Sequence, residues 1–167
     1  MTEIETISEA VRAALGECGI ENVIAAYPAG MRERYASPVV TVGIGSGSGV
    51  SGGFAEYLGI SYDEQEDTYS EIYGKRLELS LAIGIYSPKD AQYGAEKCGS
   101  IFGSIASSVS SMPSGIRVKE LKCGETVFDP RSGMFRLGAE MRITALLYAQ
   151  STDDGEILDF TLRGTVR

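Results

Sequence analysis

The sequence predicts an α+β fold, in which a mixed and mainly antiparallel sheet is packed by two helices. Apolar residues recur at helical spacing in two segments, one at the start of the chain and one in the middle. Several other segments alternate apolar and polar residues, which is typical of half-buried strands. Strands cluster after the second helical segment, so a doubly wound α/β order is disfavoured. At this length, residues 1–167 are expected to form a single domain.

The first helix is predicted from residue 4 to residue 18. Thr2 and Glu5 have the spacing of a capping box, and an apolar stripe follows at intervals of three and four. Gly19 is expected to end this helix at the C′ position. A short strand from Val23 to Tyr27 and a longer one from residue 39 to residue 44 are predicted next.

The glycine run GIGSGSGVSGG occupies residues 43–53, and residues 47–52 match G-x-G-x-x-G. A dinucleotide loop would need a helix after the glycines and an acidic residue about twenty positions later. Only residues 54–60 separate the glycines from the acidic run, and the acidic residue at that distance, Asp67, does not follow a strand. No Gly-Lys-Ser/Thr follows, as a Walker A loop would require. We therefore expect residues 45–74 to be a flexible, Gly-rich and acidic excursion between two strands, and we predict no cofactor.

The excursion is acidic and rich in tyrosine. Residues 35–74 contain six carboxylates and no Lys or Arg, so the field there repels phosphate. The run from Asp63 to Asp67 could hold a divalent cation, but it lacks the order of ligands of an EF-hand, and a solvated loop is the better interpretation. Its tyrosines favour protein contacts, or they cover the domain's own core.

The second half of the chain gives clearer signals. Alternation predicts a strand over residues 77–86, and Ser87-Pro88 then resembles the start of a helix over residues 91–111. Short strands over 116–121 and 125–129 are expected to pair with each other. A long strand over 133–149 follows, and the last one spans 158–166 after a turn.

Composition limits the chemistry that the chain can perform. It contains no histidine, which removes the commonest general base and the usual activating partner of a nucleophile. The three cysteines form no C-x-x-C pair and are expected to be reduced and buried in a cytoplasmic setting. We predict no catalytic or metal-binding residues, no signal peptide, no membrane span and no nucleic-acid recognition.

Several segments resemble prophage tail proteins of Gram-positive bacteria. The matching phrases are the following: residues 71–78 (EIYGKRLE), 83–88 (IGIYSP), 123–125 (CGE), 135–137 (FRL) and 159–164 (DFTLRG). The order of elements is similar to that of tail terminator, or tail completion (collar), proteins of long-tailed phages and phage-tail-like bacteriocins. Apart from its last residues, 71–74, the excursion over residues 45–74 has no counterpart in this resemblance.

The resemblance implies a structural protein without enzymatic activity. It implies a homo-oligomeric ring, expected to be a hexamer, that caps the tail tube and, in contractile tails, holds the last sheath ring. Assembly would take place in the bacterial cytoplasm. A strand as long as the one over 133–149 suits such an assembly, because a strand that passes its own core can contact a neighbour.

Eight residues are the candidate interface: Phe54, Tyr57, Tyr62, Tyr69, Arg136, Arg142, Phe160 and Arg163. Two alternatives stay open at this stage. One is a head–tail connector or neck protein of a phage, and the other is a carboxylate- or metal-dependent enzyme or nucleotide-binding module.

Overall fold

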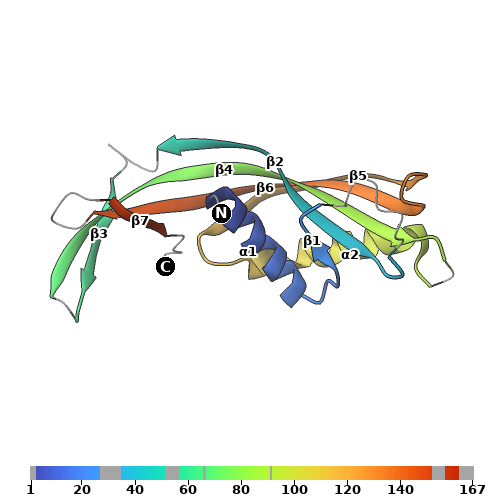
Figure 1. The fold of residues 1–167 in the computed structure, drawn as a ribbon, viewed down its shortest axis with the longest axis horizontal. Coiled ribbons are helices and arrows are strands. Elements are labelled where there is room, and N and C mark those ends of the chain that lie inside the picture. Colours follow the sequence, from blue (N-terminus) through green and yellow to red (C-terminus); the bar gives the residue numbers. More distant parts are fainter. Residues whose placement is uncertain are drawn as a thin grey trace.

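The structure is a computed structural model that describes residues 3–26, 35–51, 57–65, 67–90, 92–151 and 157–161. These residues form a seven-stranded sheet with two helices on one face, so the α+β prediction is confirmed (Figure 1). The helices are α1 (Glu3–Glu17) and α2 (Gly94–Ser108), and the 3₁₀ turn η2 (Val109–Ser111) follows α2. The strands are β1 (Val23–Ile24), β2 (Val39–Ser51), β3 (Tyr57–Asp63), β4 (Thr68–Pro88), β5 (Ile116–Asp129), β6 (Met134–Ser151) and β7 (Ile157–Thr161).

The sheet is built around the long antiparallel pair β4 and β6, which runs without a register shift from Glu71–Ser151 to Pro88–Met134. Two strands lie end to end along the other edge of β4. Ser51 at the end of β2 pairs with Lys75, and Tyr57 at the start of β3 pairs with Tyr73. Strands β5 and β7 both pair with β6, and the short β1 pairs with β2 in parallel. The sheet is therefore mixed but mainly antiparallel.

The two helices cover the middle of one sheet face, which we call the helix face. Ile7, Val11 and Leu15 of α1 and Cys98, Ile101 and Ile105 of α2 are buried in a single hydrophobic core. Odd-numbered residues of β4 supply the sheet side of this core, because alternate residues of a strand share a face. The buried strand residues are Val40, Val42, Leu77, Leu79, Leu81, Ile83, Ile85, Leu137, Met141, Ile143 and Ala145.

Residues 43–51 of the glycine run are a strand, so the prediction of a loop is wrong for them, and residues 52–53 lie outside the described residues. Residues 43–51 continue β2 and pair with β4 from Ala82 to Lys75, with one register shift between Ile44 and Ser46. Ser46 and Ser48 pair with even-numbered residues of β4, whereas Gly47 pairs with Leu79 on the helix face. A Cβ on Gly47 would overlap Cδ2 of Leu79. Pairing with a long neighbouring strand outweighs the low β-propensity of glycine.

The acidic stretch is a β-hairpin, which corrects the predicted excursion over residues 45–74. Its legs are β3 and the start of β4, and Asp63 pairs with Thr68 at the turn. We call residues 57–74 the arm, which lies at the end of the sheet away from both helices (Figure 1). Residues 39–51 and 57–63 thus both pair antiparallel with residues 68–88, and residues 52–56 of the predicted excursion lie outside the described residues. Cross-strand pairs of aromatic side chains stabilise such a hairpin.

The end of α1 agrees with the prediction from the sequence, whereas the start of α2 differs from it. Gly19 has φ 83°, and Ile20 N–H donates to Leu15 O, as expected for a C′ glycine. Helix α2, in contrast, does not start at Ser87-Pro88. Strand β4 continues to Pro88, and the carboxylate of Asp90 accepts the N–H groups of Gln92 and Tyr93 at 2.8 Å.

The predicted pair of strands over 116–121 and 125–129 is one strand, β5, and both parts pair with β6. Register shifts between Val118 and Glu120 and between Cys123 and Thr126 mark two bulges. Residues 122–124, between the two predicted strands, are therefore part of β5. The second bulge bends this strand without ending it. In the described part of the chain, neither helix is long and apolar enough to cross a membrane.

Candidate protein interface

The arm displays tyrosines on one face. Tyr62 pairs with Tyr69 and Tyr57 pairs with Tyr73, and the ring centroids of these pairs are 4.8 Å and 5.7 Å apart. The odd-numbered residues of β4 place these rings on the same side as the core residues, beyond the helices. The exposed fraction is 72% for Tyr69 and 61% for Ile60. The helix face thus continues into an uncovered aromatic surface.

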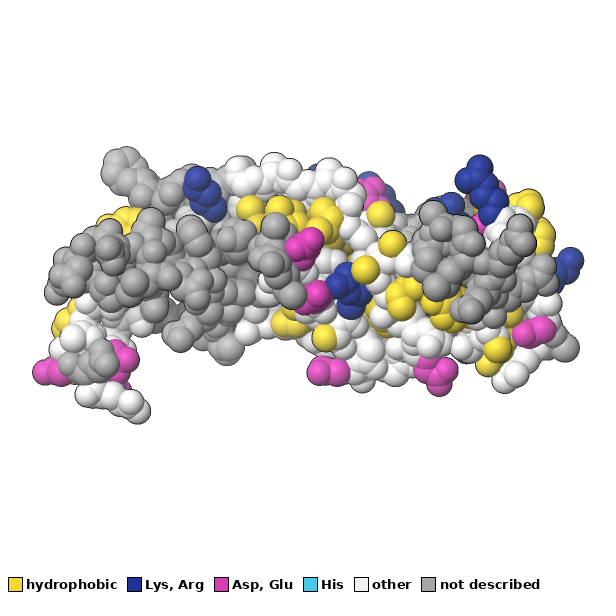
Figure 2. Space-filling view, in the orientation of Figure 1, with side chains coloured by type: hydrophobic (Ala, Val, Ile, Leu, Met, Phe, Trp, Pro, Cys, Tyr) yellow, Lys and Arg dark blue, Asp and Glu magenta, His cyan; other side chains and the backbone are white. Residues whose placement is uncertain are grey.

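The arm is also acidic, and its phenols are tied to its carboxylates. Tyr62 donates to Oδ1 of Asp67 at 2.6 Å, and Tyr73 donates to Oε2 of Glu71 at 2.5 Å. These hydrogen bonds raise the pKa of both phenols above the ordinary value of 10.0. Figure 2 shows acidic side chains at the tip of the arm, at the left-hand end of the molecule. The arm therefore offers ordered hydroxyl groups beside negative charge.

The sheet face opposite the helices, which we call the open face, has the reverse charge. Register and the first bulge of β5 place ten charged side chains on it: Arg76, Glu78, Arg117, Lys119, Glu120, Lys122, Asp129, Arg136, Glu140 and Arg142. Six of these are basic and four are acidic, and a basic excess of one remains if Glu125 of the second bulge is added. In a chain of formal net charge −8, this face is a local exception.

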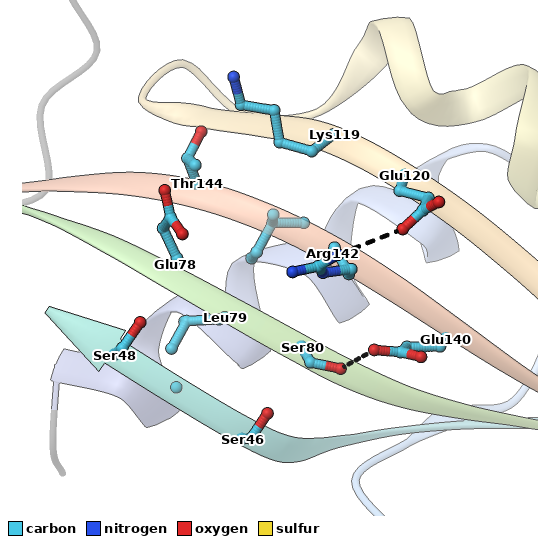
Figure 3. Close-up of a pocket in the computed structure, with 12 residues that line it drawn as sticks. Ser46, Ser48, Glu78, Leu79, Ser80, Lys119, Glu120, Glu140, Arg142 and Thr144 are labelled. Atoms are coloured by element: carbon cyan, nitrogen blue, oxygen red, sulfur yellow. Dashed lines mark hydrogen bonds and ion pairs between the residues drawn. The ribbon is translucent and has the colours of Figure 1, made fainter. Parts of the chain in front are cut away.

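A shallow polar groove crosses the open face, and Figure 3 shows it with the helices behind the sheet. Glu120 sits between two cations in this groove. Its Oε1 lies 2.9 Å from Nζ of Lys122, and its Oε2 lies 3.5 Å from Nη1 of Arg142. The hydrogen bond from Lys122, together with the nearby Arg142, holds the pKa of Glu120 below 4.5. Ser80 donates to Oε1 of Glu140 at 2.6 Å beside them.

The structure sorts the predicted interface residues into two groups. Tyr57, Tyr62 and Tyr69 lie together on the arm, whereas Arg136 and Arg142 lie on the open face. Phe160 lies in β7, where it is the register partner of Ala149. The predictions for Phe54 and Arg163 fall outside the described residues.

Lys119 and Glu120 are the site residues that the sequence interpretation missed. The first bulge of β5 brings both residues to the groove opposite Arg142. The signal available was the dense charge pattern KELK over residues 119–122, which breaks the simple alternation of a strand.

The cysteines differ from the prediction in part. Cys98 is buried in the core, but Cys18 and Cys123 are exposed. Cys18 lies just beyond the end of α1, and Cys123 adjoins the second bulge of β5, so neither is covered. All three are free thiols. Among the residues that the structure describes, no three His, Cys, Asp or Glu side chains are grouped as metal ligands.

Comparison with known proteins adds little to this description. No protein-family model matches the chain, and no curated protein sequence matches it. Among solved structures, it is similar to a chain of the "Virion of native gene transfer agent (GTA) particle". The two are 13% identical, the similarity covers 84% of this chain and 91% of that one, and the TM-score is 0.31. At that TM-score the similarity bears on neither function nor partners.

Proposed function

We propose that this chain is a structural subunit of a phage tail or a phage-tail-like particle. In this proposal it forms the ring, expected to be a hexamer, that terminates the tail tube. Where the tail contracts, the ring also holds the last sheath ring. The function is surface complementarity between subunits, and no bond is made or broken.

The observation that carries the proposal is the arm. Strands β4 and β6 run past the helices, and the sheet end beyond them exposes Ile60, Tyr62 and Tyr69 to solvent. A monomer gains nothing from exposing this surface, whereas tyrosine is enriched where proteins contact one another. The resemblance of residues 71–78 and 83–88, both in β4, to tail proteins supports the same conclusion.

The arm and the open face also differ from each other in shape and charge. A contact between two different surfaces of one subunit is heterologous, and repeated around an axis it closes into a ring. An elongated subunit with an arm at one end of its sheet suits such a contact. The proposal therefore explains the architecture as well as the exposed residues.

The proposal can be tested with the tail tube protein of the particle to which this chain is proposed to belong. Tube protein is polymerised with and without the labelled chain, and the products are imaged by electron microscopy. We expect shorter tubes that carry the label at one end only. Label spread along the sides of the tubes, or tubes of unchanged length without label, would contradict the proposal.

A further inference from the structure

We propose that the arm of one copy docks on the open face of the next copy. This inference rests on the proposed ring-forming function and specifies the contact that closes the ring. Its occupant is a second copy of this chain, because the two surfaces that complement each other are both present on the same molecule.

Charge is the first argument for this pairing. The arm carries four described carboxylates and no Lys or Arg: Asp63, Glu64, Asp67 and Glu71. The open face carries six Lys or Arg against four Asp or Glu. Two arms would repel each other, and so would two open faces, whereas the arm and the open face attract. Like-charge repulsion thus excludes the symmetric pairings and selects the heterologous one.

The groove around Arg142 provides a binding site for a carboxylate. Glu120 is shared between Arg142 and Lys122, so one negative charge faces two positive ones. Lys119 extends from the same bulge on the Thr144 side of the groove (Figure 3) and forms no ion pair within the described residues. A guanidinium has five N–H donors, and Arg142 directs one contact to Glu120. Glu78 and Glu140 also line the groove, and Arg76 pairs with Glu78. With Arg76 and Lys122 counted beside Lys119 and Arg142, four cations face three carboxylates, so one positive charge and several hydrogen-bond donors are available to an incoming anion.

The arm supplies acidic and aromatic groups that complement this binding site. Glu64 lies at the turn, exposed and without an ion pair among the described residues. The neighbouring rings of Tyr62 and Tyr69 are exposed and held against each other, so little side-chain entropy remains to be lost on binding. Tyrosine beside arginine is a common combination at the centre of protein interfaces. The arm thus combines an acidic tip with a rigid aromatic surface.

Charge reversal tests the contact in the full-length chain. The arm variant is Glu64→Lys with Glu71→Lys, and the face variant is Arg117→Glu with Lys119→Glu. Arg117 and Lys119 make no ion pair among the described residues, so their replacement should leave the fold intact, which circular dichroism checks. Each variant alone should shift the assembly equilibrium by about tenfold or more toward monomer in mass photometry or sedimentation.

Rescue gives the decisive result. In an equimolar mixture, the basic arm of one variant meets the acidic face of the other, and the unchanged arm meets the unchanged face. The mixture should therefore regain the assembled mass of the original chain, and so should a single chain with all four substitutions. If the mixture stays monomeric, or if neither variant alone disturbs assembly, the arm does not dock on the open face.

A matched control separates the contact from net charge. Glu17→Lys with Glu21→Lys makes the same charge change as the arm variant, but at the exposed end of α1. This control should assemble like the original chain, and its disassembly would overturn the inference. If the original chain and both variants all assemble, only the contact between the arm and the open face is refuted. If the original chain never assembles, both the proposed function and this contact are refuted.

Discussion

Gly84 of β4 and Gly138 of β6 are register partners, yet only one of the two positions has space for a side chain. A Cβ on Gly84 would lie 2.6 Å from Oγ1 of Thr41 and 2.9 Å from a ring carbon of Tyr86, whereas a Cβ on Gly138 meets nothing within 4 Å. The Thr41 hydroxyl also donates to Gly84 O at 3.3 Å and accepts from Gly84 N–H at 3.1 Å. Gly84 is therefore part of a buried contact between β2 and β4.

The two glycines should respond differently to alanine. Gly84→Ala is expected to lower the free energy of unfolding by about 1–3 kcal/mol, because a methyl group forces Thr41 and Tyr86 to move. Gly138→Ala should be neutral or stabilising by roughly 0.5 kcal/mol, because it reduces the freedom of the unfolded chain. Urea unfolding at constant m-value measures both. Equal effects at the two positions would contradict this account.

The glycine run offers a second comparison within one strand. Gly47→Ala should destabilise the protein by about 1 kcal/mol more than Gly49→Ala, because its Cβ would overlap Leu79 and overpack that side of the sheet. At Gly49 the nearest atom is 3.5 Å from the new Cβ, which is an ordinary contact. The same unfolding experiment decides. If both substitutions are harmless, residues 47–49 are not packed against β4 as described.

Acid should weaken the cluster around Glu120. The pKa of Glu120 is lowered in the folded state, so its contribution is present above the ordinary value of 4.5 and is lost as pH falls through the lowered pKa. Glu120→Gln should remove this part of the acid dependence of the free energy of unfolding. Lys122→Met should also reduce it, because the donor of the hydrogen bond is gone. Unchanged acid dependence in both variants would argue against the cluster.

Thiol reactivity should distinguish the three cysteines. Cys98 is fully buried, and burial raises the pKa of its thiol. Cys18 and Cys123 are exposed, so a chromogenic disulfide reagent should titrate two thiols quickly and the third only after unfolding. Cys18→Ser and Cys123→Ser should each remove one fast thiol. Three fast thiols in the folded protein would contradict the packing of α2 against the sheet.

Much of the architecture could be predicted because single elements carry their own signals. The stripe through Ile7, Val11 and Leu15 gave α1, and Gly19 marked its end. The glycine run was missed because glycine and serine have low β-propensity, and its alternation becomes informative only when Gly47 is seen against Leu79. That contact joins residues far apart in the sequence.

The candidate interface was predictable in composition but not in arrangement. The tyrosines of the arm could be named from the sequence, but their common face depends on the register between β3 and β4. The bulge that brings Lys119 and Glu120 together opposite Arg142 depends on the pairing of β5 with β6. Register is a property of two strands, so neither strand alone reveals it.

In the proposed function, this chain acts as part of a closed assembly of identical copies. The most direct measurement is its mass in solution over a range of protein concentrations, by sedimentation or native mass spectrometry. The account predicts a discrete species of about six times the subunit mass of 17.8 kDa, in equilibrium with smaller forms. A strict 17.8 kDa monomer at every concentration, and also in the presence of tail tubes, would contradict it.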